Sequence, residues 1–154
     1  MIVVSDTSAI TSLIRIGREE ILGAVCDEIL IPVAVRDELL AFHASLPRFL
    51  TTVPIQNLTA AESLTSEIDR GEAEAIVLAQ ETLPDFVLLD DLAARGIAAQ
   101  RRLRVIGLLG VLTLAKQQGF VSAVKPALID LEVIAGFRIA PELRRRVLQA
   151  CGEG

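Results

Sequence analysis

The sequence has almost none of the side chains on which soft-metal and histidine-based chemistry depend. It contains a single histidine, His43, and two cysteines, Cys26 and Cys151, in 154 residues. This set fits no zinc-ligand spacing, and no nucleophile motif accompanies His43 to support a Ser-His-Asp or Cys-His mechanism. The composition therefore disfavours both a zinc centre and a histidine-dependent hydrolase.

Aromatic residues and long apolar runs are also scarce. The chain has no tryptophan, no tyrosine and five phenylalanines, so it offers few platforms on which nucleic-acid bases could stack. No uninterrupted apolar stretch approaches the ~20 residues that span a bilayer, and no basic segment precedes the first apolar residues as in a signal peptide. We therefore expect a cytoplasmic protein with free thiols and no association with a membrane.

Apolar side chains are abundant, and charge is unevenly distributed. Hydrophobic residues make up 52% of the chain, and its length suits a single domain over residues 1–154. Residues 1–91 carry 5 Lys/Arg against 16 Asp/Glu, whereas residues 92–154 carry 10 against 4. The asymmetry could place a basic rim beside an acidic centre, although ordinary solvated helix faces explain the counts more simply.

Short buried strands alternate with helices along the chain. Runs rich in Val, Ile and Leu predict strands over residues 2–4, 28–31, 86–89 and 103–106, with a candidate edge strand over 50–53. Helices are predicted over residues 9–14, 18–25, 33–44, 59–68, 72–79, 92–101, 107–118, 124–135 and from 141, and a turn over 69–71. This alternation predicts an α/β fold with a parallel sheet covered by helices on both faces.

Acidic residues follow two of these predicted strands. Asp6 ends the first, and Asp90 and Asp91 follow the strand over 86–89 directly. Ligands of open α/β sheets bind at the carboxyl edge, so these acids converge there if the two strands are neighbours. The alternative role of each is to cap the helix that follows it.

Glutamates on two predicted helices are further candidates. Glu38 projects on the same side as Leu39 and Phe42, which is a costly place for an unpaired carboxylate, unless it is a solvated residue at the stripe's edge. Glu72 shares a side with the small residues of its helix, whereas Glu74 points away from that side. Acids in a first helical turn also favour the helix dipole without any further role.

Carboxylates gathered at one place repel one another. Two of them ~4–5 Å apart at an effective dielectric near 20 repel by roughly 3–4 kcal/mol, against a typical domain stability of ~5–15 kcal/mol. Only a counter-ion makes three or four of them tolerable. An all-oxygen ligand set suits Mg²⁺ or Mn²⁺ and not Zn²⁺, and such ions activate water and neutralise charge on a phosphodiester.

Several segments that contain these acids form an ordered set. They are Val4-Ser5-Asp6-Thr7-Ser8, Ile31-Pro32 with Glu38-Leu39, Gly71-Glu72-Ala73-Glu74-Ala75-Ile76, Leu88-Leu89-Asp90-Asp91 with Ala94-Arg95, Val105-Ile106-Gly107, and Ala135-Gly136-Phe137-Arg138-Ile139. In this set the chain resembles the PIN-domain nucleases, and most closely a prokaryotic branch of VapC-like toxins from toxin–antitoxin pairs.

The resemblance implies a PIN-like, Rossmann-like α/β/α sandwich with a central, mostly parallel sheet. It implies cleavage of RNA that depends on Mg²⁺ or Mn²⁺. Catalytic positions of the family fall on Asp6, Glu38, Glu72, Asp90 and Asp91, and metal ligands on the same residues without Glu38. The doubled aspartate leaves open which of the two binds metal.

The resemblance also implies partners. These are an RNA substrate, a cognate antitoxin protein and a second copy in a homodimer. Arg95, one helical turn after Asp91, and Ser8 are the candidates for contact with RNA. Such contact would read mainly backbone and shape, because aromatic platforms are so few.

Two other functions compete with this interpretation. A catalytically degenerate interaction module would keep the fold as a dimer or a partner-binding platform, and the high apolar content is compatible with it. An aspartyl-phosphate site is weaker, because Ser8 stands two residues after Asp6 where haloacid-type phosphatases carry a second aspartate.

Overall fold

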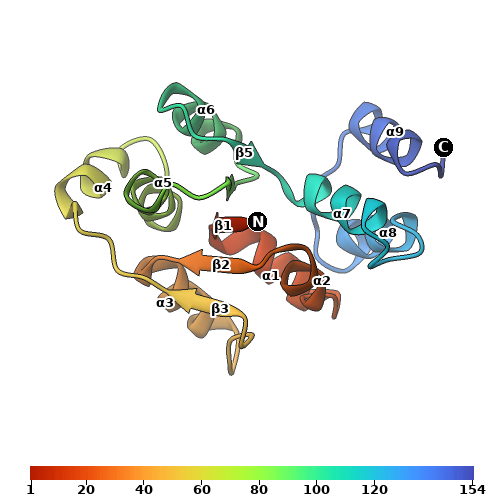
Figure 1. Ribbon diagram of the computed structural model, residues 1–154, viewed down its shortest axis with the longest axis horizontal. Helices are drawn as coiled ribbons and strands as arrows, with labels where there is room; N and C mark the ends of the chain where they lie inside the picture. Colours follow the sequence, from red (N-terminus) through yellow and green to blue (C-terminus); the bar gives the residue numbers. More distant parts are fainter.

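Five short strands form one parallel sheet at the centre of the protein. The computed structural model describes all of residues 1–154, and its strands are β1 (Ile2–Ser5), β2 (Glu28–Ile31), β3 (Leu50–Thr52), β4 (Phe86–Leu88) and β5 (Val105–Ile106). Their order across the sheet is β3-β2-β1-β4-β5, and every neighbouring pair is parallel (Figure 1). The predicted parallel sheet is confirmed, and β1 lies at its middle.

Nine helices surround this sheet. They are α1 (Thr7–Arg15), α2 (Glu20–Val25), α3 (Val33–Phe42), α4 (Leu58–Leu64), α5 (Arg70–Thr82), α6 (Leu92–Gln100), α7 (Leu108–Gln117), α8 (Lys125–Val133) and α9 (Pro141–Ala150). In Figure 1, α7, α8 and α9 lie together on one side of the molecule, and α4 and α5 lie on the other. None of the helices is both long enough and apolar enough to cross a membrane.

The period of two along the strands divides the core between the faces of the sheet. Val3 and Leu88 pack into a cluster with apolar residues of α1, α2, α7 and α8. Val4 and Val87, which lie opposite each other on β1 and β4, pack into a second cluster with α4, α5 and α6. Successive side chains of a strand point to opposite faces, so one short apolar strand serves both clusters. The result is the predicted α/β/α sandwich.

The main departure from the predicted elements is at residues 69–71. These residues were expected to form a turn, but α5 begins at Arg70 and includes Gly71. Asp69 caps the helix by accepting the N–H of Glu72 at 2.8 Å, and Glu72 in return accepts the N–H of Asp69 at 3.2 Å. This reciprocal capping box stabilises the first turn of a helix, so the chain is helical where glycine favoured a turn.

A second departure is the shorter helix near the C-terminus. The helix predicted over 124–135 ends at Val133, and Gly136 follows with φ +67°. The Phe137 N–H then donates to the Leu131 carbonyl at 2.8 Å. A left-handed glycine after the last helical turn is a frequent way to end a helix. Gly136 therefore acts as the predicted stop signal, but it lies three residues beyond Val133, where the helix ends.

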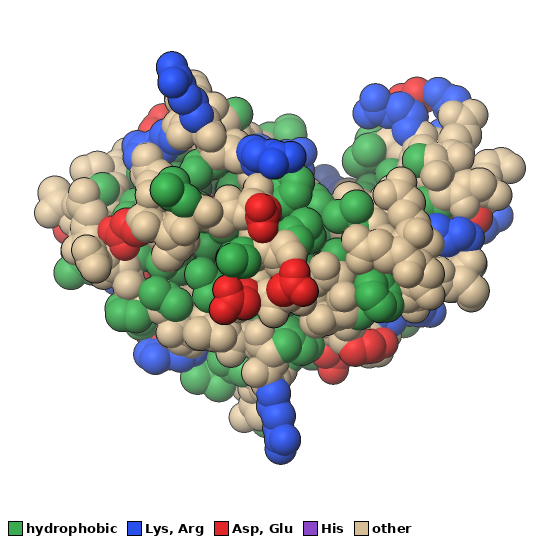
Figure 2. All heavy atoms as spheres, viewed as in Figure 1, with side chains coloured by type: hydrophobic (Ala, Val, Ile, Leu, Met, Phe, Trp, Pro, Cys, Tyr) green, Lys and Arg blue, Asp and Glu red, His purple; other side chains and the backbone are tan.

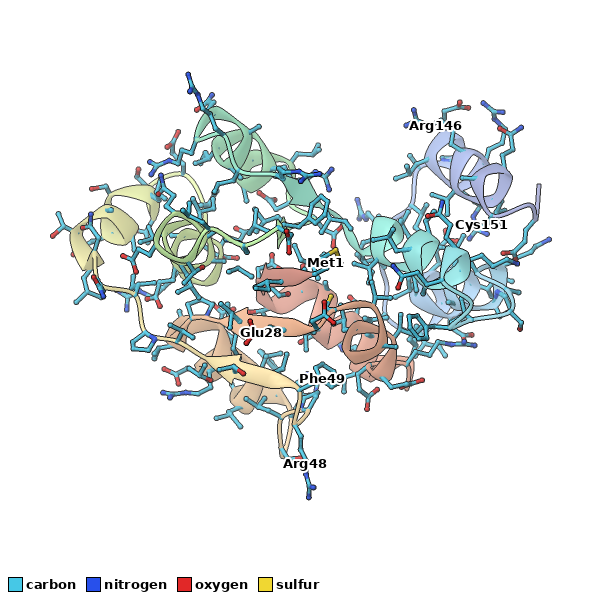
Figure 3. All side chains as sticks on the ribbon, in the orientation of Figure 1. Met1, Glu28, Arg48, Phe49, Arg146 and Cys151 are labelled. Atoms are coloured by element: carbon cyan, nitrogen blue, oxygen red, sulfur yellow. The ribbon has the colours of Figure 1, made fainter.

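Basic side chains of the second half of the chain lie on projecting parts of the surface. Figure 2 shows Lys and Arg gathered on α9 and near α6, on either side of an indentation. Arg146 extends outward from α9, whereas Cys151 at the end of that helix is buried (Figure 3). Arg144 and Arg145 pair with Glu132 and Glu142. Two of the three consecutive arginines are therefore engaged in ion pairs on the surface.

Candidate active site

Neighbouring strands bring Asp6 and Asp90 to the same edge of the sheet. β1 pairs with β4 so that Ser5 lies opposite Leu88, and the Asp6 N–H donates to the Leu88 carbonyl at 3.2 Å. Asp6 is only 2% exposed. Its pKa is raised well above the ordinary value, chiefly by burial and then by the charges of Asp90, Glu72 and Asp69. Asp6 is therefore a buried acid whose protonation is influenced by the charges of three other acids.

The adjacent Asp90 and Asp91 have different roles. Asp91 is exposed and accepts the Ala94 N–H at 3.0 Å, so it caps α6. Asp90 is half-buried and accepts the Leu108 N–H at 3.1 Å and 3.3 Å through its two oxygens. Burial raises the pKa of Asp90, while this hydrogen bond and the nearby Arg95 oppose the increase. The capping role falls to Asp91, and Asp90 is the member of the pair whose charge acts on Asp6.

Glu72 is held at the start of α5 and is buried. Its pKa is raised to about 7, mainly by burial, with Asp69 and Asp91 as the nearby acids that raise it further. Asp69 was not among the predicted site residues. The Asp-x-x-Glu spacing of a capping box, from Asp69 to Glu72, is the sequence signal that could have identified it.

Glu74 lies away from Glu72, as predicted, but it is not solvated. It is buried and accepts the Ala34 N–H at 3.1 Å at the start of α3. A carboxylate that accepts from the first turn of another helix compensates an N–H that would otherwise be unpaired there. Glu74 therefore joins α5 to α3, and it borders a small cavity that Glu38 also lines.

Glu38 is presented from α3 toward the start of α1 and α5. It is half-buried and accepts a short hydrogen bond from the Thr7 hydroxyl. A Cβ at Gly71 would lie 2.8 Å from both carboxylate oxygens of Glu38, so glycine permits this approach. On the same side of α3, Leu39 is buried but Phe42 is 74% exposed. The apolar side of α3 inferred from the sequence is therefore buried at Leu39 but exposed to solvent at Phe42.

These side chains line one cavity of about 270 Å³, which we call the acidic cavity. Its lining consists of four acids, three hydroxyl residues, one cation and one aromatic residue: Asp6, Glu38, Asp69, Glu72, Thr7, Ser8, Thr11, Arg15 and Phe42. The Ser8 hydroxyl donates to Asp6 at 3.4 Å. Thr11, Arg15 and Phe42 were not predicted as site residues, although the sequence had placed Phe42 on the side of Glu38.

Asp90 and Arg95 line a neighbouring cavity of about 510 Å³ and not the acidic cavity. The Arg95 Nη1 donates to the Leu89 carbonyl at 3.0 Å, which fixes the guanidinium beside the end of β4. Arg138 shares this second cavity. The predicted site residues are thus divided between two cavities. Asp6, Glu38 and Glu72 share the acidic cavity. Asp90 lines the second cavity, but it is close enough to Asp6 for its charge to raise the pKa of Asp6.

The carboxylate oxygens are the type of ligand that a hard divalent cation prefers, but they are not arranged around a single point. No group of three or more Asp, Glu, His or Cys side chains is gathered closely enough to hold a metal ion. Glu38 is turned to Thr7, Glu72 to the Asp69 N–H, and each of these oxygens already has a protein partner. The donor set is nonetheless all oxygen, as Mg²⁺ and Mn²⁺ prefer, and burial, followed by the charges of the neighbouring acids, raises the pKa of Asp6.

Comparison with protein-family models gives a match over nearly the whole chain. A family model described as a PIN domain matches residues 2–153, and PIN domains are generally nucleases. No curated protein matches the chain. The matched segment spans the whole sheet and the end of every strand that carries an acid. Together with the parallel sheet and the acids at its carboxyl edge, this match shows that the chain belongs to the PIN-domain family.

Proposed function

We propose that this PIN domain is an endoribonuclease that depends on Mg²⁺ or Mn²⁺. The observation that carries the proposal is Asp6, a carboxyl buried at the end of the central strand, whose pKa is raised first by this burial and then by the charges of three other acids. Keeping like charges together in a buried place costs stability, and natural proteins tolerate that cost where the charges serve binding or catalysis. A hydrolytic site that neutralises them with a cation accounts for the arrangement.

The residues that would hold the cation are Asp6, Glu72 and Asp90, with Glu38 as a further carboxylate of the cavity. Of the doubled aspartate, Asp90 is the proposed ligand, because Asp91 serves as the cap of α6. When bound, the cation would orient a water molecule for attack on a phosphodiester and neutralise the developing charge. Glu38 and Glu72 each use one carboxylate oxygen for a hydrogen bond within the protein, so the other oxygen would be the one that contacts the cation.

Neighbouring polar groups would position these acids. The Ser8 hydroxyl orients Asp6, the Thr7 hydroxyl orients Glu38, and the Leu108 N–H orients Asp90. Positioning matters because a displacement of ~1 Å in a catalytic group can lower a rate by ~100-fold. Ser8 and Arg95 remain the proposed RNA contacts, Ser8 inside the acidic cavity and Arg95 in the adjoining one.

We propose further that the protein is the toxin of a toxin–antitoxin pair and forms a homodimer. Support comes from the resemblance in the ordered segments of the sequence. Leu83, Leu92 and Val133 are all more than three-quarters exposed, on separate parts of the chain. Single exposed apolar residues are common on protein surfaces, so they do not by themselves mark a site for an antitoxin or a second copy.

Cleavage of defined RNAs with Mg²⁺, with Mn²⁺ and with a chelator tests the enzymatic part. The Asp6→Asn variant should lose metal-dependent cleavage while its circular dichroism spectrum stays that of the wild type. Asp37→Asn is the matched control, because Asp37 is an exposed aspartate of α3 outside the acidic cavity. Equal cleavage by the wild type and Asp6→Asn would refute the role of Asp6. Absence of cleavage by the wild type with every metal would favour the interaction module.

A further inference from the structure

The acidic cavity contains one cation and one aromatic ring that the proposed metal chemistry does not use. Arg15, at the end of α1, makes no ion pair within the protein although four acids line the same cavity. Phe42, at the end of α3, is 74% exposed and is the most exposed of the five phenylalanines. An exposed ring and an unpaired guanidinium at one cavity are groups available for a ligand.

Helix periodicity places these two groups on the same faces as the residues that orient the acids. Thr7, Thr11 and Arg15 recur at intervals of four on α1, and Phe42 follows Glu38 by four on α3. At 1.5 Å per residue, Arg15 is ~12 Å along its helix from Thr7, and Phe42 is ~6 Å from Glu38. Because α1 and α3 are neighbours that both begin at the carboxyl edge of the sheet, the cavity runs from the acids toward Arg15 and Phe42.

We infer that Arg15 and Phe42 form a nucleotide subsite next to the acids, in which Arg15 binds a phosphate and Phe42 stacks on an unpaired base. This inference rests on the proposed function. An RNA strand is repelled by four carboxylates and needs a fixed positive charge to enter such a cavity, and the guanidinium matches a phosphate in bidentate geometry. A base can stack on Phe42 only if it is not already stacked within a duplex.

The composition of the cavity favours a nucleotide over an apolar protein segment. Phe42 is the one hydrophobic residue among nine that line it, and three of the others are hydroxyl residues. Aromatic anchors of protein interfaces lie in well-packed apolar surroundings. Phe42 also borders a second cavity with Ile14 and Phe49, but in the acidic cavity its neighbours are hydroxyl residues, acids and an arginine. This set matches the alternation of phosphate, sugar and base along a nucleic-acid strand.

The absence of tryptophan and tyrosine gives a direct test of stacking. Phe42→Trp introduces the only tryptophan, so its fluorescence reports on this position alone. Phe120→Trp is the matched control, because Phe120 is also exposed, at 51%, and lies outside the acidic cavity. Each variant is titrated with a short oligoadenylate, free or annealed to oligouridylate, in chelator so that no strand is cleaved and in low salt, which strengthens phosphate contacts.

The subsite predicts saturable quenching of Phe42→Trp by the single strand, weak quenching by the duplex and none in Phe120→Trp. Adding Arg15→Ala to Phe42→Trp should weaken the apparent affinity about tenfold, and Arg15→Lys should weaken it less. Equal quenching in both tryptophan variants, or none in either, would overturn the subsite. An emission shift that follows protein concentration without RNA would also overturn it, by assigning Phe42 to an interface between copies.

Steady-state cleavage separates this subsite from the catalytic acids. Phe42→Ala should raise KM about tenfold, equivalent to about 1.4 kcal/mol and within the range for base–aromatic stacking, with little change in kcat. Phe42→Trp should restore KM, whereas a ring with only a structural role would affect the unfolding temperature instead. Wild-type cleavage with an unchanged KM in Phe42→Ala overturns the subsite alone. Quenching without any cleavage refutes the nuclease and leaves the subsite standing.

Discussion

Gly71→Ala tests whether the close approach of α5 to Glu38 serves catalysis. Gly71 is the second residue of α5, and an added Cβ would lie 2.8 Å from both carboxylate oxygens of Glu38, against ordinary contacts that begin at 3.4 Å. The Glu38 carboxylate therefore has to retreat by about 0.6 Å or more, since its flexible end yields more easily than the backbone. The substitution therefore displaces the Glu38 carboxylate and leaves the Glu38 side chain itself unchanged.

The expected effects on stability and activity differ in size. Alanine is favoured over glycine inside a helix by ~0.5–1 kcal/mol, whereas weakening the hydrogen bond from Thr7 to the charged Glu38 costs up to ~1.5–3 kcal/mol. Glu38 is half-buried, so water replaces part of that bond, and we expect a net change in unfolding free energy within ~1 kcal/mol of zero. Displacement of a catalytic group by this distance should lower kcat by ~10–100-fold.

Thermal unfolding and RNA cleavage are measured side by side, with Gly96→Ala as the control. Gly96 lies in α6, and a Cβ there meets nothing within 4 Å. Gly96→Ala should therefore be more stable by the ~0.5–1 kcal/mol that alanine gains over glycine in a helix, and it should keep full activity. Wild-type activity in Gly71→Ala would refute the positioning of Glu38, and unfolding of Gly71→Ala would show that the approach is structural and not catalytic.

Other predictions follow from the charges of the site. Asp6→Asn should raise the unfolding temperature by ~2–4 °C per kcal/mol gained, because burial and neighbouring acids disfavour the carboxylate; a lower unfolding temperature in chelator would count against it. Glu72, whose pKa is raised to about 7, binds its proton more tightly in the folded state. Its contribution to stability is therefore highest at acid pH and falls as pH rises through about 7. Mn²⁺ should reverse this fall. Both effects are measured as the free energy of unfolding in urea at several pH values, and Glu72→Gln should reduce the pH dependence seen without metal. Asp91→Ala should cost ~1 kcal/mol through the cap of α6 and reduce single-turnover cleavage much less than Asp90→Ala, an order that would be reversed if Asp91 were the ligand.

The sequence predicted the position of the acids through the order of strands and helices. Alternation of apolar strands and helices implied a parallel sheet, and acids at two strand ends converge once β1 and β4 are known to be neighbours. That adjacency was the one condition the pattern could not supply, since strand order depends on packing across the whole chain. The side of α3 that carries Glu38 and Phe42 was likewise predictable from helix periodicity.

The remaining details depend on contacts between segments far apart in the chain. Glu74 is buried because its partner is the Ala34 N–H, forty residues away, and helix periodicity alone indicated only that it faced away from Glu72. Arg15 and Phe42 are individually ordinary residues at helix ends, and they meet only through the packing of α1 beside α3. Which of Asp90 and Asp91 caps α6 depends on side-chain rotamers, which no periodicity encodes.

The like charges of the acidic cavity call for a hard divalent cation to neutralise them. Isothermal titration of the purified protein with Mn²⁺ measures this binding, with Asp6→Asn and Asp37→Asn as the paired variants. We expect saturable Mn²⁺ binding to the wild type and to Asp37→Asn, and loss of most of that binding in Asp6→Asn. Equal heats of binding in all three proteins, or no binding to any of them, would contradict this expectation.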